Sequence, residues 1–301
     1  MKKKELSLLI LIVTSLMLSY TVLIPRINCN PLPAPEDHFV GGIVSNRSVS
    51  LNLLNADVLF NIDSTDFSNN IGIDFSGNYT IFNPDKKINI TLYAPFSLEI
   101  DVVSSNCLVQ INDTMIPFEI LYIYELDYNV STYIEDYLSS PGSMFITALI
   151  ICNLTISENS TNTIKYQFSG MMPKRSNDFS ISYDLGTARA WEGDLNEYVE
   201  FKVIGKIPDG YREYTNGTFE DRCEITDINN GKVYTWEWNN EKTNILQVGI
   251  IYKAKLFSFE FIILIIVLVG VSAIIGITIT IIMVRRKRKI QKEIYSQREL
   301  A

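Results

Sequence analysis

Histidine is almost absent from this sequence of 301 residues, which contains only His38. One histidine cannot form a multi-histidine metal site, and no Gly-x-Ser-x-Gly or metalloprotease motif occurs in the chain. The segment Asp227–Gly231 resembles a calcium loop only in part, because its glycine comes one residue early and no closing glutamate follows. We therefore expect a protein that is not an enzyme and that holds no metal and no cofactor.

Cysteine is also scarce, and no two cysteines have the Cys-x-x-Cys spacing of zinc or thioredoxin-like motifs. An even number of cysteines outside the cytoplasm favours disulfides, and four cysteines allow three connectivities. We expect a bond between Cys107 and Cys152, which would contribute about 4 kcal/mol by closing a long loop. The remaining Cys29 and Cys223 would form the second bond.

Positive charge is concentrated at the two ends of the chain. The residues from Arg285 onward have a net charge of +5, and the first five residues have +2. Since the whole chain has a net charge of −8, the stretch between the two ends has −15. Nucleic-acid binding needs a basic surface, which excludes nucleic acid as a partner of this acidic stretch. The basic tail, in contrast, suits anionic lipid headgroups of a membrane.

The longest apolar run is Phe261–Val284, which contains no charged residue and is followed by the basic cluster Arg285–Lys289. As a helix it would span about 36 Å, enough to cross a hydrocarbon core of about 30 Å. Basic flanks accumulate on the cytoplasmic side. We predict a transmembrane helix at 258–284 and a cytoplasmic tail at 285–301, with the N-terminal part outside the cytoplasm. The pattern does not distinguish a cell surface from an internal lumen.

The start of the chain agrees with this topology. Lys2–Lys4 precede the apolar stretch Leu6–Ile24, as in a secretory signal peptide. No strong cleavage site follows, so an uncleaved signal anchor is the alternative for residues 1–28. The proline-rich residues 29–37 should form an extended spacer.

The expected outer part contains eight Asn-x-Ser/Thr sequons, which are glycosylation candidates in an exported protein. In Ile88–Leu92, polar and apolar residues alternate, so Asn89 would face solvent while Ile90 and Leu92 face a core. Glycans would then cover the solvent face of a half-buried sheet, although strands rich in Asn and Thr also produce such spacing by chance. The candidates are Asn46, Asn78, Asn89, Asn112, Asn129, Asn153, Asn159 and Asn216.

Alternating stretches separated by turn residues continue to position 252 and predict a mainly β fold, with one or two immunoglobulin-like β-sandwich domains. Asn230-Gly231 predicts a hairpin, because a type I′ turn needs positive φ at both central residues. One helix is expected at Ser131–Leu138. A short polar run near residue 175 divides the chain into a first sandwich at 38–171 and a smaller one at 177–253. The smaller core would depend on Trp191, Trp236 and Trp238.

Two segments have a family resemblance. Gly77–Asn83 with Ile88–Phe96, and Tyr183–Thr187 with Trp191–Gly193, are similar to segments of immunoglobulin-like domains in uncharacterised prokaryotic exported proteins. The resemblance covers about a fifth of the chain. It implies a β-sandwich surface protein and no catalytic residue.

These observations lead to two functional hypotheses. The first is a single-pass protein of the cell membrane whose glycosylated outer domain binds a protein or glycan ligand, mediates adhesion or supports the envelope. The second is an accessory subunit of a membrane complex of the translocase or transporter type. Ser272, Gly276 and Thr280 recur every four residues, and small residues at that spacing permit close helix contact with such a partner or with a second copy of the chain.

Overall fold

The protein is described here from a computed structural model. It defines residues 36–97, 100–137, 147–173, 179–215, 221–241, 244–253, 267, 270, 274 and 276–290. The chain divides into a compact body that ends at Lys253 and a second unit, Ala254–Ala301.

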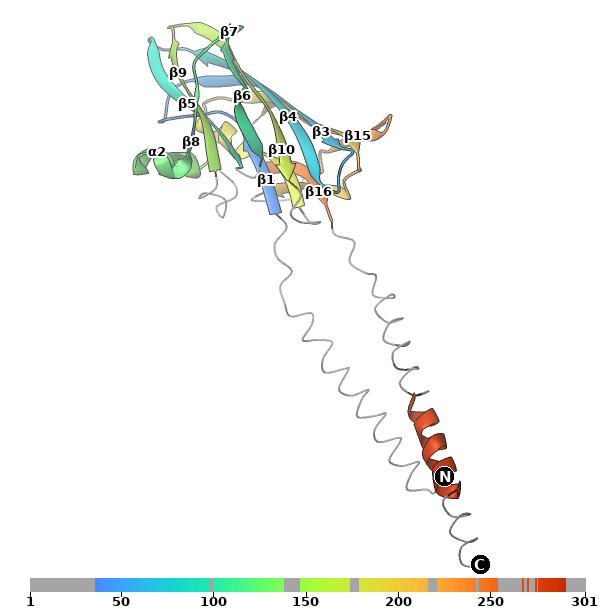
Figure 1. Ribbon diagram of the computed structural model, residues 1–301. Helices are drawn as coiled ribbons and strands as arrows, with labels where there is room; N and C mark the ends of the chain where they lie inside the picture. Colours follow the sequence, from blue (N-terminus) through green and yellow to red (C-terminus); the bar gives the residue numbers. More distant parts are fainter. Residues whose placement is uncertain are drawn as a thin grey trace, which may run out of the picture. The chain divides into compact units, whose positions relative to one another are not determined.

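The body is a sandwich of two β-sheets, A and B, which confirms the mainly β prediction (Figure 1). Sheet A has the order β13 (Gly210–Thr215), β16 (Ile245–Tyr252), β11 (Phe179–Asp184), β1 (Glu36–Gly41), β5 (Ile88–Ser97), β9 (Thr147–Ile156) and β8 (Glu119–Tyr122), with β2 (Val44–Ser45) beside β5. Sheet B has the order β14 (Glu224–Ile228), β15 (Gly231–Glu241), β12 (Leu195–Gly205), β3 (Asn52–Ser64), β4 (Asn70–Asn83), β10 (Ser160–Pro173), β6 (Asp101–Ile111) and β7 (Thr114–Met115).

Short helices complete the described body: η1 (Ile123–Glu125), α2 (Tyr128–Glu135) and η3 (Leu185–Ala190). The predicted helix exists as α2, but it begins three residues earlier than expected. Its Ile134 is fully buried and packs with Leu149 and Ile151 on β9. The helix therefore covers a small apolar cluster on the outer face of sheet A.

The core between the sheets follows from the alternation of side chains along each strand. On β3, Val58, Phe60 and Ile62 point inward and are at most 1% exposed. The Phe60 ring stacks on the ring of Phe201 from β12, with centroids 4.3 Å apart. Burying one such side chain contributes about 1.5–3 kcal/mol. The inward prediction for Ile90, Leu92 and the three tryptophans is confirmed, because all of them are buried.

The predicted boundary between two sandwiches is wrong. β1 pairs in parallel with β11, and β3 pairs in parallel with β12 along ten residues of each strand. Strands from both sides of the expected boundary at 171–177 thus belong to both sheets and share one core. The short polar run marks a connection within a single sandwich, because these parallel partners need one another to complete their sheets.

The only histidine of the sequence, His38, lies on β1 within sheet A, is 2% exposed and has its ring 6.1 Å from that of Phe179. The predicted hairpin between β14 and β15 is confirmed, but its turn lies one residue earlier than expected. Ile228 pairs with Gly231, so Asn229 and Asn230 connect the strands, and of the expected central residues Asn230 has positive φ, 58°, while Gly231 does not. Positive φ is the conformation for which Asn and Gly are favoured in such turns.

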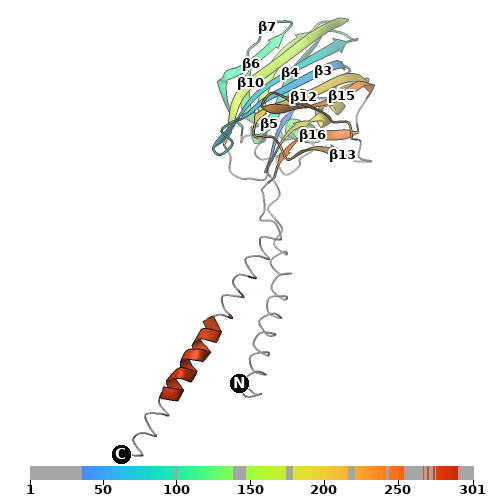
Figure 2. The same cartoon turned by 90° about the vertical axis from the view of Figure 1, so that its right-hand side faces the viewer.

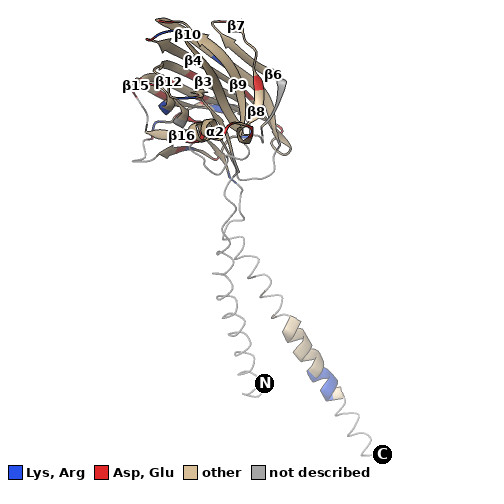
Figure 3. Cartoon of the chain, turned by 90° about the vertical axis from the view of Figure 1, so that its left-hand side faces the viewer, with Lys and Arg blue, Asp and Glu red and all other residues tan. Residues whose placement is uncertain are grey.

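In the second unit, the described residues 276–290 are helical. Lys and Arg gather toward the end of this helical segment (Figure 3). Within the part of the chain that the structure describes, no helix has the length and apolar character needed to span a membrane. Much of the predicted span at 258–284 lies outside the described residues, as do the predicted signal segment at 1–28, most of the spacer at 29–37 and much of the tail at 285–301.

Candidate functional site

A row of polar side chains lies on the outer face of sheet B. Lys202 on β12 is opposite Asn61 on β3, Asn61 is opposite Asp74 on β4, and Asp74 is opposite Ser169 on β10. The four positions form a row that crosses four neighbouring strands, which Figure 2 shows side by side. Their neighbours along the strands are buried, apart from the half-buried Gly170, so the row points away from the core.

The next row along the same face contains a gap. Ile204, Asp63, Gly72 and Met171 are opposite one another on the same four strands. Gly72 has no side chain, so the face is hollowed between Asp63 and Met171. The resulting cavity of about 580 Å³ is lined by both rows, and we call it the Gly72 hollow. Its other lining residues are Ile62, Ile73, Asn106 and Gly170.

Gly72 sets the depth of the hollow without backbone strain. A Cβ atom placed on Gly72 would lie 3.6 Å from the Cβ of Asp63 and 3.8 Å from the Sδ of Met171. These are ordinary van der Waals distances. A larger side chain at this position would therefore fill the hollow while leaving the strand pairing possible.

Four of the polar side chains around the hollow are not used by the fold. Among the described residues, the side chains of Asn61, Asp74, Ser169 and Lys202 have no hydrogen bond or ion pair with another residue. Neighbouring strands are about 4.8 Å apart, so the backbones of Lys202 and Asp74 are about 10 Å apart across β3. A cation and a carboxylate thus face the same cavity with an amide between them.

Asp63 adds a second carboxylate with a fixed charge. Its Oδ1 accepts hydrogen bonds from the backbone N–H and the hydroxyl of Thr65, at 3.0 and 2.7 Å. These hydrogen bonds lower the pKa of Asp63, because they stabilise the ionised form. The hollow therefore contains two carboxylates and one lysine, together with the exposed apolar side chains of Met171 and Ile204.

The edge of the hollow is also irregular. Opposite Ser169, the pairing between β10 and β6 shifts, so that residues 103–106 of β6 are placed against a single residue of β10. Such bulges bend a strand and re-aim side chains, and they are common beside functional sites. Asn106, at the end of this bulge, lines the hollow.

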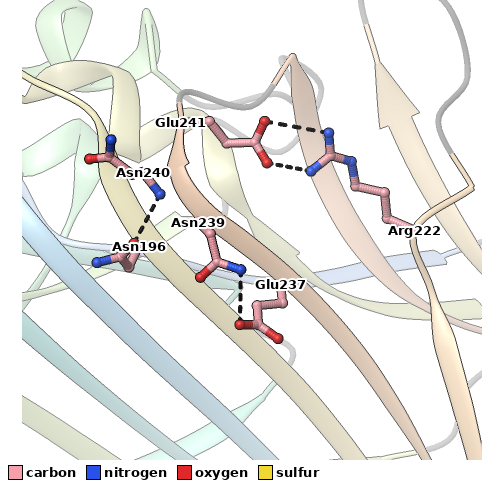
Figure 4. Close-up of polar contacts among 6 residues, drawn as sticks. All are labelled: Asn196, Arg222, Glu237, Asn239, Asn240 and Glu241. Carbon is pink, nitrogen blue, oxygen red and sulfur yellow. Dashed lines mark hydrogen bonds and ion pairs between the residues drawn. The ribbon is translucent and has the colours of Figure 1, made fainter.

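A second polar cluster lies at the ends of β12 and β15 (Figure 4). Arg222 forms a two-pronged ion pair with Glu241, with N–O distances of 2.5 and 3.5 Å. The backbone N–H of Asn240 donates to Asn196, and the Asn239 amide donates to Glu237. These groups are partnered with one another, so the cluster stabilises the strand ends rather than presenting free groups to a ligand.

A third polar group is buried between the sheets. The hydroxyl oxygens of Tyr79 and Tyr183 are 3.3 Å apart, and the hydroxyl of Tyr166 donates to the carbonyl of Gly41. Glu197, which is 3% exposed, lies beside Tyr183. Burial raises the pKa of Glu197 to about 8, and its hydrogen bond with Tyr183 offsets this only in part. The group is closed to ligands and acts within the core.

The predicted glycosylation candidates are mostly on the surface. Five sequon asparagines are exposed, two are half-buried, and Asn216 lies outside the described residues. Modification itself stays a prediction. The exposed ones are Asn89, Asn112, Asn129, Asn153 and Asn159, and the half-buried ones are Asn46 and Asn78.

Two of the sequons are joined across neighbouring strands. The Thr91 hydroxyl donates to the side-chain oxygen of Asn153 at 2.7 Å, and the Thr155 hydroxyl donates to that of Asn89 at 2.8 Å. Thr91 and Thr155 are the hydroxyl residues of the Asn89 and Asn153 sequons, so each sequon contacts the other. Both amide oxygens are therefore occupied, and the nitrogens that would carry glycans make no hydrogen bond to a described residue.

The predicted disulfide between Cys107 and Cys152 is not present. Cys107 belongs to β6 in sheet B and Cys152 to β9 in sheet A, and no disulfide joins the described cysteines. Burial raises the pKa of the Cys107 thiol to about 11 and that of the Cys152 thiol to about 12. Both side chains pack as small apolar groups in the core. Cys29, the expected partner of Cys223, lies outside the described residues.

The predicted helix-contact stripe is described only in part. Ser272 lies outside the described residues. The Thr280 hydroxyl donates to the carbonyl of Gly276 at 2.9 Å, so it is satisfied within its own helix. A Cβ on Gly276 would have no atom within 4 Å.

Comparison with known proteins identifies the fold but no family. No family model matches the chain, and no curated protein matches it. Among solved structures, a protein of Legionella pneumophila proposed to bind nutrients is similar with a TM-score of 0.52 and 13% identity, over 73% of this chain and 72% of that one. At this identity the likeness concerns the fold alone.

Two M1 zinc metallopeptidases also match. One is a two-domain enzyme with a TM-score of 0.34 and 10% identity, and the other, from Deinococcus radiodurans, has a TM-score of 0.33 and 11% identity. Each match covers 69% of this chain, which spans only 44% and 43% of the respective enzymes. Such low similarity supports no statement about activity.

Sequence reasoning did not find the Gly72 hollow. Asn61, Asp63 and Asp74 are polar residues within alternating stretches of the sequence, a pattern typical of ordinary solvent-facing strand positions. Their assembly depends on the strand register, and Lys202 reaches the row only through the parallel pairing of β12 with β3. The one local signal was Gly72, since glycine within a strand often marks a site of close approach.

Proposed function

We propose that this protein is a single-pass, membrane-anchored surface protein whose β-sandwich binds a small polar ligand in the Gly72 hollow. The observation that carries the binding role is the row Lys202, Asn61 and Asp74, three polar side chains that face one cavity without partners among the described residues. The cavity volume is within the range of small-molecule sites. Polar groups around a preformed cavity are what such sites use to orient a ligand.

The proposal is for binding rather than turnover. Ser169 is the hydroxyl group in the row, and a serine nucleophile needs an adjacent base. The only histidine of the chain, His38, is buried in sheet A and does not line the hollow. The carboxylates and the lysine remain suited to holding charges of a ligand.

The anchoring part rests on the apolar run 261–284 and the basic residues that follow it. Its test is protease treatment of sealed cells that express a version with a C-terminal epitope tag. The body should be digested while the tag is protected until the membrane is opened. Digestion of the tag with an intact body would reverse the orientation.

The binding part is tested with the full-length protein in detergent micelles. We expect at least one member of a panel of amino acids, short peptides and sugars to raise the melting temperature, because a ligand that binds only the folded state stabilises it. The Gly72→Val variant should lose this response. If no compound acts, or if the variant responds as the wild type does, the hollow is not a ligand site. Adhesion or envelope support would then be the role of the sandwich.

A further inference from the structure

We propose that the Gly72 hollow takes a zwitterionic ligand of the amino-acid or short-peptide class, an inference that rests on the proposed binding function. The ligand carboxylate would bind Lys202, and its ammonium group would bind Asp74 and Asp63. Asn61, between the two poles, would hold the polar backbone of the ligand.

The charges of the lining favour this class. The hollow contains one cation and two carboxylates, and Lys202 and Asp74 have no ion-pair partner in the described chain. A ligand that carried only negative charge would meet Asp63 and Asp74 without compensation. A purely cationic ligand would leave Lys202 unpaired beside it. A zwitterion satisfies both signs at once.

The spacing of the row also fits. The backbones of Lys202 and Asp74 are about 10 Å apart because one strand separates them. Charge-assisted hydrogen bonds have lengths of about 2.8 Å. The two side chains leave the same face of the sheet. The length of two such bonds, added to the few ångströms between the ammonium and carboxylate groups of an amino acid, is therefore comparable with the backbone separation. The flexible lysine side chain can adjust to a longer peptide.

The apolar part of such a ligand has a place as well. Met171 is 49% exposed and Ile204 is 40% exposed, and both line the hollow on either side of Asp63 and Gly72. They offer apolar contact next to the charged row. Sugar sites generally use an aromatic platform, and no aromatic side chain lines this hollow among the described residues.

The test uses three related probes on the full-length protein in detergent: L-leucine, leucinamide, which lacks the carboxylate, and N-acetyl-leucine, which lacks the ammonium group. Isothermal titration should show L-leucine binding about tenfold or more tightly than either derivative, since each removes a charge-assisted contact. The dipeptide Leu-Gly distinguishes a preference for peptides from one for free amino acids.

Single variants assign each pole of the ligand. Lys202→Met should remove the preference for L-leucine over leucinamide. Asp74→Asn should remove the preference for L-leucine over N-acetyl-leucine. Gly72→Val should abolish binding of all probes. Lys165→Met, on the same face of β10 but outside the hollow, is the matched control and should bind as the wild type does. Unfolding midpoints of all variants report whether the fold is intact.

The outcomes separate the ligand class from the binding function. If sugars bind in a Gly72-dependent way while zwitterions do not, the ligand class is overturned and the binding function stands. If the three leucine probes bind equally, or if Lys202→Met changes nothing, the assigned poles are wrong. If no probe and no panel compound binds, both proposals fail.

Discussion

The hydroxyl oxygens of Tyr79 in sheet B and Tyr183 in sheet A are 3.3 Å apart and connect the two sheets in the middle of the core. Glu197 extends this contact, because it lies beside Tyr183 and is itself buried. Buried polar groups of this kind are stable only while they are satisfied. The pair thus makes the packing of the sheets sensitive to the charge on one carboxyl group.

Stability should fall as pH rises. The pKa of Glu197 is about 8 in the folded protein against a usual value of 4.5, so the folded state keeps its proton where the unfolded state has lost it. The free energy of unfolding should therefore decrease between about pH 4.5 and pH 8, by up to ~5 kcal/mol. Glu197→Gln should flatten this dependence, as measured by urea unfolding at several pH values. Equal slopes for Glu197→Gln and the exposed Glu192→Gln would contradict this.

The sandwich should unfold as one cooperative unit. Phe60 and Phe201 come from opposite sides of the expected domain boundary and stack in one core. Phe201→Ala should cost about 3–5 kcal/mol and should lower hydrogen-exchange protection in β3 and β4 as well as in β12. The exposed Ile225→Ala on β14 is the control and should have little effect. Two separate unfolding transitions would restore the two-domain arrangement.

Gly231 should tolerate no side chain. A Cβ at this position would lie 1.9 Å from the carbonyl oxygen of Val203 on the neighbouring strand, so β15 and β12 would have to separate locally. Gly231→Ala should reduce the free energy of unfolding by about 2 kcal/mol or more. Gly210→Ala is the matched control, since a Cβ there has no atom within 4 Å. Thermal denaturation of both variants provides the measurement, and equal losses would argue against this close approach.

Glycopeptide mapping should find sugar on the exposed sequons, including Asn89 and Asn153. Thr91→Val should remove the glycan at Asn89 alone, although it also deletes the hydrogen bond to Asn153. The exposed Thr163→Val lies outside any sequon and should change neither peptide. Unmodified peptides from protein made in its native cells would show that the sequons arise from composition.

What could be predicted from the sequence follows from local chemistry. Alternation along the strands predicted the buried sides of β5 and β9, where Ile90 and Leu154 face the core, and Asn230-Gly231 predicted a hairpin. These signals depend on neighbouring residues only. They report which side of a strand is apolar, and they contain nothing about which strand lies beside it.

The remaining features depend on contacts between distant residues. The pairing of β3 with β12 brings Asn61 and Lys202 together across about 140 positions of sequence. Neither the single sandwich nor the Gly72 hollow can be deduced without that register. His38 likewise has no local signal that marks it as part of a strand within sheet A, because it is a polar residue close to a proline-rich stretch.

The two parallel pairings also affect how the chain folds during synthesis. β1 and β3 leave the ribosome early, but their partners β11 and β12 follow some 140 residues later. Long-range pairing of this kind is slow, because the entropy of closing a large loop is lost before the stabilising contacts between the strands can form. The edges of β1 and β3 that pair with β11 and β12 therefore stay unpaired until the chain has been synthesised to residue 205. A chain that cannot fold early stays threadable, as the export proposed above would require.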